Sequence, residues 1–167
     1  MSKCANDELV LHYFRASEFG KTDHRDRDWW PAMNPGLLVR LDVLRSMWGG
    51  PIHVSGHARA LGRHGGDSHS DHNVDRWGDV RGADVFISDV RYRADVEAVK
   101  MAAEEVGFSS IGVYPDWRGG IGFHLGVREG NGGRQPMATW GAVSREGSQE
   151  YVSFKEALSK VPVVDRG

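Results

Sequence analysis

GADVFIS, residues 82–88, gives the clearest indication of how this chain folds. Val85, Phe86 and Ile87 form a continuous apolar run, which is typical of a strand buried at the centre of a sheet. Asp84 stands at the entry of that strand, directly after a long glycine-broken loop over residues 58–81. The segment therefore predicts a central strand with a carboxylate beside a polar loop that contains histidines.

Helix and strand patterns lie on both sides of this segment. Residues 36–51 carry leucines at spacings of three and four before Gly49-Gly50-Pro51, which predicts a helix that stops there. Residues 89–108 show a second apolar helix face, with Gly107 as its cap. Further elements are predicted as a short strand through Ile52 and Val54, strands over residues 111–115 and 120–128, an edge strand over 138–143 and a terminal helix near 154–158. This order predicts an α+β fold with a small, mainly antiparallel sheet and flanking helices.

The composition is that of an ordinary globular protein, and its 167 residues suit a single domain over residues 1–167. The formal net charge of −2 gives no general attraction to nucleic acid or to an anionic membrane, and no apolar run approaches bilayer length, so we expect neither partner. Residues 1–14 lack the basic region and apolar run of a secretory signal, so we expect a cytoplasmic protein. The single cysteine, Cys4, excludes an internal disulfide. The 22 glycines indicate tight turns and backbone packed close to other groups.

Three side chains are candidate metal ligands. His72 lies in the loop before the central strand, Asp84 opens that strand, and His124 lies inside the apolar strand GFHLGV. Two imidazoles and one carboxylate are a suitable ligand set for a zinc peptidase, in which a fourth position stays open for water. A histidine in an apolar strand is often only a half-buried core residue, and an aspartate before a strand is often a turn residue. The joint placement of all three beside glycine-rich turns favours a metal site.

The spacing of these residues also follows a known pattern. Ser70-x-His72, Ala83-Asp84-Val85 and the strand FHLGVR at residues 123–128 occur in the order found in the D-Ala-D-Ala carboxypeptidase-type zinc peptidases, which the chain resembles. Weaker matches over most of the chain include Gly112-Val113-Tyr114-Pro115. The resemblance is to subfamily A of the LAS group, which has the hedgehog/D,D-peptidase fold and includes many phage endolysins that cleave peptidoglycan stem peptides. It implies zinc held by His72, Asp84 and His124.

The chain departs from the family pattern at several points. The usual spacing of six residues from the first histidine points to Asp79, so Asp79 stays open as an alternative ligand to Asp84, which we favour because it opens the apolar strand. The family's Ser-Gly-Tyr-Arg turn corresponds to residues 55–59, which implies that Arg59 orients a substrate carboxylate or carbonyl. The aspartate that usually stands two residues after the last histidine is Gly126 here, which leaves the hydrogen bonding around that ligand unassigned.

Peptide hydrolysis also needs a proton carrier and groups that hold the substrate. A general base should be a carboxylate one water away from the metal. Asp116, in the turn before His124, is our first candidate and Asp79 our second. Ser70 and His57 are predicted to contact substrate. The tryptophans at positions 77, 117 and 140 either wall a groove or pack in the core.

The leading hypothesis is a monomeric zinc metallopeptidase that hydrolyses an amide bond in peptidoglycan stem peptides, as a D,D-carboxypeptidase or an endopeptidase. The lack of an export signal fits an endolysin that a phage releases to the cell wall or carries in its virion. The alternative keeps the fold and the metal without catalysis, as a structural or wall-binding component of a phage particle, and Gly126 is the feature that favours it.

Overall fold

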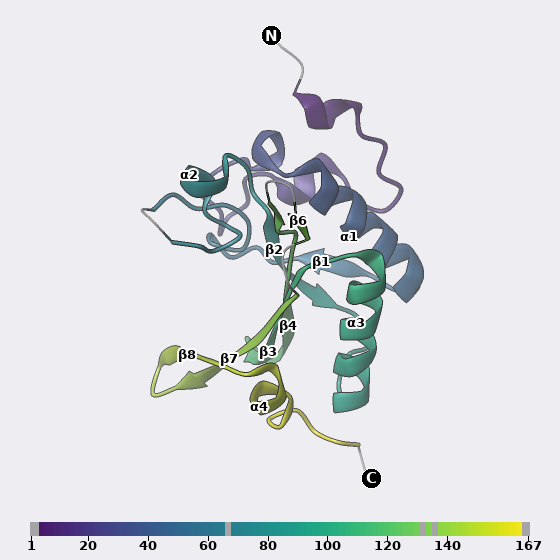
Figure 1. Cartoon of the computed structure of the whole chain (residues 1–167), viewed down its shortest axis with the longest axis vertical. Helices are drawn as coiled ribbons and strands as arrows, with labels where there is room; N and C mark the ends of the chain where they lie inside the picture. Colours follow the sequence, from purple (N-terminus) through teal and green to yellow (C-terminus); the bar gives the residue numbers. More distant parts are fainter. Residues whose placement is uncertain (1–3, 66–67, 131–132, 135–136, 165–167) are drawn as a thin grey trace.

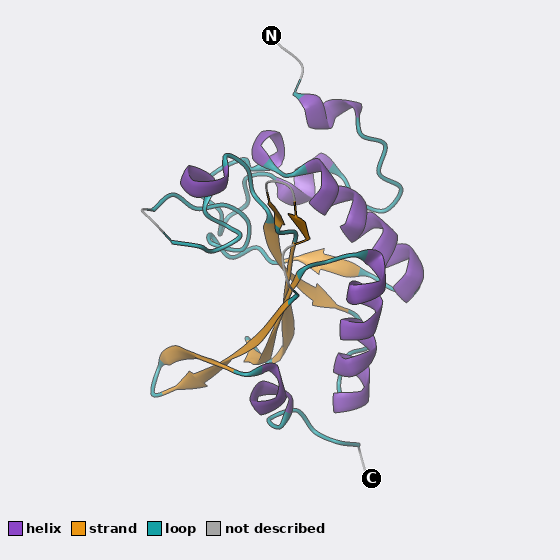
Figure 2. Ribbon diagram, in the orientation of Figure 1, coloured by secondary structure: helices purple, strands orange, loops and turns teal. Residues whose placement is uncertain are grey.

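Figure 1 shows the computed structural model, which describes residues 4–65, 68–130, 133–134 and 137–164. Over these residues the chain is α+β, as the sequence predicts, with a six-stranded sheet and four α-helices. The two long helices, α1 (Pro35–Trp48) and α3 (Arg93–Val106), lie next to each other on one side of the sheet (Figure 2). The short helix α4 (Phe154–Leu158) packs against the sheet further along.

The sheet is mixed rather than purely antiparallel. Its strand order is β1-β2-β4-β3-β7-β8, and the bounds are β1 (Ile52–Val54), β2 (Gly82–Ile87), β4 (Gly120–Gly126), β3 (Ser110–Trp117), β7 (Ala138–Arg145) and β8 (Ser148–Val152). Within this sheet β3 and β7 are parallel, and the other neighbouring pairs are antiparallel. β2 lies between β1 and β4, so the prediction of a central strand at residues 82–88 is confirmed.

The prediction of an edge strand at residues 138–143 is wrong. β7 lies between β3 and β8, and β8 occupies the edge. The sequence SQEYV of β8 is polar and exposed over most of its length, so it carries no apolar alternation that would indicate a strand. The remaining short elements are η1 (Ala5–Glu8), η2 (Ala16–Phe19), η3 (Trp30–Ala32), α2 (Val74–Trp77) and the ribbon of β5 (Glu129–Gly130) with β6 (Gly133–Arg134).

The ends of the long helices follow from their capping residues. The side chain of Asn34 accepts a hydrogen bond from the Leu37 N–H at the start of α1. α1 ends at Gly49 and α3 at Gly107, both of which have the positive φ that glycine adopts without strain. Both predicted helices are therefore present, and each is slightly shorter than its apolar pattern indicates. No helix in the described part of the chain is long and apolar enough to cross a membrane.

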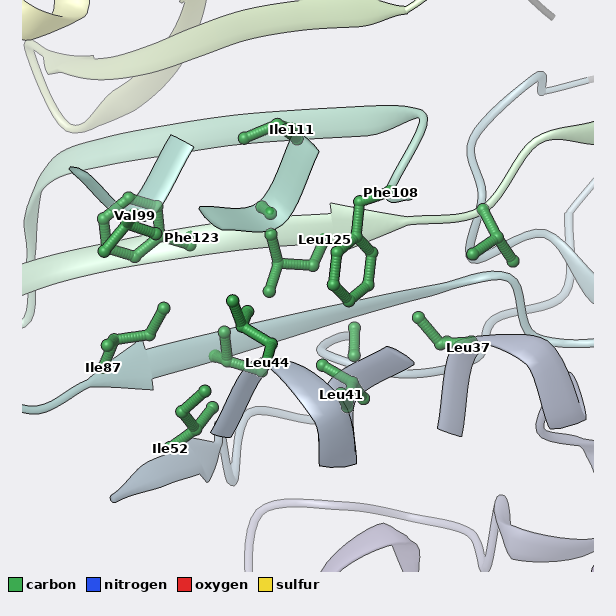
Figure 3. Packing of buried hydrophobic residues seen from close by; sticks show 14 of the residues in the cluster. Leu37, Leu41, Leu44, Ile52, Ile87, Val99, Phe108, Ile111, Phe123 and Leu125 are labelled. Atoms are coloured by element: carbon green, nitrogen blue, oxygen red, sulfur yellow. The ribbon is translucent and has the colours of Figure 1, made fainter. Parts of the chain in front are cut away.

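The core fills the space between the long helices and one face of the sheet (Figure 3). Its helix side is formed by leucines of α1, and its sheet side by alternate residues of the strands, among them Val85, Ile111, Val113, Phe123 and Leu125. Successive side chains of a strand point to opposite faces of a sheet. Asp84 and His124 are sequence neighbours of these core residues, so they lie on the other face, away from α1 and α3.

The segment before α1 is held in place by buried charged side chains. Arg25 is buried and donates hydrogen bonds to the backbone carbonyls of Gly20 and Ser55. The carboxylate of Asp42 on α1 accepts hydrogen bonds from the backbone N–H groups of residues 12 and 13. Buried charges are tolerated when such bonds replace those to water. Arg25 thereby fixes the turn after β1, which carries His57 and Arg59.

The core can be tested on the two faces of α1. Leu44 is 1% exposed and Met47 is 47% exposed on the same helix. Leu44→Ala should lower the free energy of unfolding by about 2–5 kcal/mol, because it removes buried apolar contacts and leaves a cavity. Met47→Ala should change it by no more than about 0.5 kcal/mol, because the side chain lies at the surface. Urea denaturation measures both values, and equal losses would show that α1 does not pack through this face.

Candidate metal centre

Two of the three predicted ligands are brought together by the register of neighbouring strands. β2 and β4 are antiparallel, and Asp84 lies directly opposite His124. His72 comes from the loop before β2. Its backbone carbonyl accepts a hydrogen bond from the Arg63 N–H at 2.9 Å, which fixes the turn that carries it. The loop is thus tied down at the residue whose side chain reaches the two strands.

The three candidate ligand atoms form a compact triangle. His124 Nδ1 lies 3.1 Å from His72 Nε2 and 3.1 Å from Asp84 Oδ1, and His72 Nε2 lies 3.5 Å from Asp84 Oδ1. A tetrahedral ion with bonds of ~2.0–2.1 Å separates its ligand atoms by ~3.3 Å. All three residues are buried. The group therefore has the donor atoms and the spacing that a divalent metal ion requires.

The second nitrogen of each imidazole has its own hydrogen-bond partner. His72 Nδ1 contacts the backbone oxygen of Leu61, and His124 Nε2 lies 2.9 Å from Asp71 Oδ2. A carbonyl or an ionised carboxylate can only accept a hydrogen bond, so these nitrogens carry the protons. The nitrogens left to bind an ion are then His72 Nε2 and His124 Nδ1, which are the two nitrogen atoms of the triangle; on His124 Nδ1 the ion would replace the proton shared with Asp84 Oδ1. Metal-binding histidines are commonly oriented in this way.

The charges around the triangle favour a cation. Burial by itself would lower the pKa of His124, but hydrogen bonds and charges from Asp71 and Asp84 outweigh it and raise that pKa to about 9. Burial also opposes ionisation of Asp71, yet His124 and Arg128 lower its pKa to about 2. The pKa of Asp84 is likewise held well below its usual range by the two ligand histidines, against the effect of burial. Two buried carboxylates therefore stay ionised at neutral pH and attract a metal ion in place of the proton on His124.

Glycines on the strands leave room for aromatic rings on this face. Gly112 of β3 is the neighbour of His124 on one side and of Trp140 on the other. A Cβ at position 112 would come within 2.5 Å of the Trp140 ring, and one at position 122 within 2.1 Å of the Trp117 ring. Because both positions are glycine, the Trp140 ring lies against His124, with ring centres 5.3 Å apart. Part of the high glycine content is explained by this arrangement.

The triangle opens onto a cleft of about 640 Å³. Trp117 and Trp140 line it, whereas Trp77 is not among its described lining residues, so two of the three tryptophans wall a groove. Tyr114 also lines the cleft and donates a hydrogen bond from its hydroxyl to Asp84 Oδ1 at 3.2 Å. Burial, and then the charge of Asp84, raise the pKa of Tyr114, so its hydroxyl stays protonated.

The predicted substrate-binding residues lie around this cleft. His57, Arg59 and Ser70 all line it. The Ser70 hydroxyl also accepts a hydrogen bond from the backbone N–H of His72 at 3.3 Å, so it helps to shape the turn before that ligand. The structure brings these residues to the cleft, and their contact with a substrate stays a prediction.

The two predicted general bases lie elsewhere. Among the residues that the structure describes, neither Asp79 nor Asp116 lines the cleft. The Asp79 carboxylate accepts hydrogen bonds from Asn34 Nδ2 at 2.8 Å and Arg81 Nε at 2.7 Å, while Asp116 is exposed on β3. Asp84 rather than Asp79 therefore joins the two histidines, as we favoured. A role for Asp79 or Asp116 in proton transfer stays a prediction.

Sequence reasoning missed several residues of the cleft. Asp71, Arg63 and Arg128 line it, and none was assigned a role from the sequence. Asp71 stands immediately before a predicted ligand, and Gly126 marked a missing hydrogen-bond partner for His124. These two features are the only ones in the sequence from which a carboxylate partner for His124, supplied by another part of the chain, could have been predicted.

Comparisons with protein-family models, with curated proteins and with solved structures found no match for this chain. Evidence for its function therefore comes from the side chains of the site.

The metal centre predicts which substitutions remove the ion. His72→Ala, Asp84→Asn and His124→Ala should each lower the bound metal from about one ion per chain to a small fraction of that, because three protein ligands are needed to hold it. Asp79→Asn and His64→Ala are matched controls outside the triangle and should keep the ion. Elemental analysis after dialysis measures the stoichiometry, and loss of metal in the Asp79→Asn protein would contradict the assignment of Asp84.

Proposed function

We propose that the chain is a zinc-dependent peptidase that hydrolyses an amide bond in peptidoglycan stem peptides, as a D,D-carboxypeptidase or endopeptidase with the hedgehog/D,D-peptidase fold. The observation that carries this proposal is the buried triangle of His72, Asp84 and His124 at the base of a cleft. In this proposal the enzyme is phage-encoded and acts on the cell wall in the manner of an endolysin.

The choice of zinc rests on the donor set. Two imidazole nitrogens and one carboxylate oxygen with tetrahedral spacing suit Zn²⁺ better than ions such as Mg²⁺ and Ca²⁺, which prefer oxygen ligands. With three protein ligands and an open position, zinc supplies a water that ionises near neutral pH and a Lewis acid for an amide carbonyl. The protein residues hold the ion, orient its ligands and bind the peptide beside it.

The charge of the cleft supports an anionic substrate. Arg59 and Arg63 line it without an ion pair to any carboxylate in the described ranges. The two aspartates that line it, Asp71 and Asp84, are both hydrogen-bonded to His124. The open part of the cleft is therefore cationic, which suits a peptide that carries free carboxylates. A guanidinium can hold a carboxylate through two parallel hydrogen bonds.

Tyr114 gives the cleft a neutral hydrogen-bond donor next to the metal ligands. Its hydroxyl stays protonated and already points to Asp84 Oδ1. In this proposal Tyr114 holds the Asp84 carboxylate, and Arg59 stabilises negative charge developing on the carbonyl oxygen of the bound amide. Trp117 and Trp140 form aromatic walls against which the peptide packs.

A second candidate function is metal binding without catalysis, in a structural or wall-binding component of a phage particle. The observation that favours it is that, of the described residues lining the cleft, both carboxylates already have a role in the metal site: Asp84 belongs to the triangle and Asp71 is hydrogen-bonded to His124. No carboxylate in that lining is left to serve as a general base. The predicted bases Asp116 and Asp79 would have to act from outside the lining.

Hydrolysis and its dependence on metal separate the two functions. Purified protein should release new amino groups from peptidoglycan, and treatment with a chelator should abolish the release until zinc is restored. His124→Ala should abolish most of the release because it removes one of three ligands of the ion, whereas His64→Ala should keep the wild-type rate. A protein that binds zinc through the triangle but releases no amino groups would establish the second function.

The cationic side of the cleft predicts a preference for peptides with a free carboxylate. Arg63→Gln should raise KM for such a peptide about 10-fold or more while changing KM little for its amidated form, because a charge-assisted hydrogen bond is lost. Arg91→Gln is the control, since Arg91 is exposed and outside the cleft lining. Steady-state kinetics on the paired peptides measure the effect, and equal changes for both peptides would exclude carboxylate recognition by Arg63.

A further inference from the structure

The ring of His124 is held by a residue from outside its own strand. Asp71 lies in the loop before β2, and its side chain is 1% exposed. Its Oδ2 accepts the Nε2–H of His124 at 2.9 Å, and its Oδ1 accepts a hydrogen bond from Arg128 Nε at 2.9 Å. Hydrogen bonds therefore connect three side chains in a row, from Arg128 through Asp71 to the candidate ligand His124.

Two glycines make the space that Asp71 occupies. Gly82 and Gly126 lie directly opposite each other on β2 and β4, next to the pair of Asp84 and His124 and on the same face. A Cβ at position 126 would lie 2.6 Å from Asp71 Oδ2 and 3.0 Å from His124 Nε2. A Cβ at position 82 would lie 2.9 Å from Asp71 Cβ and 2.6 Å from His124 Cε1. A side chain at either position would displace the carboxylate or the ring.

The backbone holds Asp71 at this place. The Asp71 carbonyl accepts a hydrogen bond from the Arg81 N–H at 2.9 Å, and the Arg81 carbonyl accepts one from the Val127 N–H at 2.8 Å. These bonds join the loop to the segment entering β2 and to the segment leaving β4. His72, the next residue after Asp71, is itself a candidate ligand. One turn therefore delivers both a ligand and the partner of another ligand.

We propose that Asp71 is a positioning residue that orients the metal ligand His124. Arg128 holds the Asp71 carboxylate, and the lack of side chains at Gly82 and Gly126 leaves room for it. The carboxylate keeps the proton of His124 on Nε2 and fixes the ring so that Nδ1 points to the ion. The Asp71 carboxylate comes from the loop before β2 and occupies the space that a side chain at position 126 of β4 would fill. This inference rests on the proposed metal-binding function.

The consequence is a loss of metal affinity that does not depend on catalysis. Removing such an outer hydrogen-bond partner typically weakens metal binding by ~10–100-fold. Asp71→Asn keeps the size of the side chain and one acceptor but removes the charge, so its loss of zinc affinity should be near the lower end of that range. Asp71→Ala removes the acceptor altogether and should lie near the upper end.

Zinc dissociation constants, measured by competition with a chromophoric chelator, are the first readout. Asp75→Asn is the matched control, because Asp75 also pairs with a histidine, His64, at 2.7 Å but is exposed and away from the cleft. The second readout is the ¹⁵N NMR spectrum of the histidines. The wild type should show His124 with its proton on Nε2 and zinc on Nδ1, and Asp71→Ala should lose this single arrangement.

A reciprocal exchange tests the role of Gly126. Gly126→Asp in the wild type should weaken zinc binding, because its side chain and Asp71 compete for the same space. The double substitution Asp71→Ala with Gly126→Asp should recover at least ~10-fold of the affinity lost in Asp71→Ala, since a carboxylate again reaches His124 Nε2. Circular dichroism is recorded for each protein so that affinities are compared between folded chains.

The results separate this inference from the proposed function. A wild-type protein that binds no zinc would refute both. Zinc binding that depends on His72, Asp84 and His124 but is unchanged, within twofold, in Asp71→Asn would overturn the positioning role alone. Should Asp71→Ala fail to fold, Arg128→Gln and the double variant give the decision. The positioning role of Asp71 is supported if Arg128→Gln binds zinc more weakly and the double variant folds and binds zinc. Unchanged zinc binding in Arg128→Gln overturns it.

Discussion

The pairing of Asp84 with His124 across β2 and β4 is the constraint on which the site depends. Strand side chains alternate between the two faces of the sheet, so this register sends Val85 and Phe123 into the core while Asp84 and His124 meet on the other face as two of the three candidate ligands. A slip of one residue would exchange the two sets and bury charged groups against α1 and α3. The hydrophobic core and the site therefore enforce the same register from opposite faces.

The two faces of the sheet differ in the side chains that they carry. The core face carries large apolar side chains that pack against the helices, and these supply most of the stabilising burial. The site face has glycine at positions 82, 112, 122 and 126, where it gives space to Asp71, Trp117, Trp140 and the ring of His124. Glycine weakens a strand because it adds backbone entropy to the unfolded chain and offers no side chain for packing. The dense core beneath the same strands offsets that cost.

A feature of the fold or of the site could be predicted from the sequence where a local pattern of residues determines it. The two long helices and the strand at residues 82–88 have regular apolar patterns and glycine caps, and the structure confirms them. His72, Asp84 and His124 are predicted as ligands from their placement beside glycine-rich turns and from their order along the chain, and the structure brings the three side chains together. The exposed strand β8 has no such pattern, so the sequence predicts an edge strand at β7, whereas the structure has β8 at the edge. Asp71 was missed because its role comes from tertiary contacts with His124 and Arg128, which lie more than fifty residues away.

Metal binding and hydrolysis make different demands on this cleft. Asp71 and Asp84 would strengthen the hold on a cation because both are ionised, Asp84 as a ligand and Asp71 through its hydrogen bond to Nε2 of His124. Neither carboxylate would then be free to accept a proton, since protonation of Asp84 would remove a ligand and protonation of Asp71 would weaken the contact that orients His124. In the proposed reaction, proton transfer would then need a group outside the metal scaffold, and Asp116 and Asp79 are the predicted candidates. In the proposed function, metal affinity and catalysis therefore depend on different residues, so that a substitution can change one without the other.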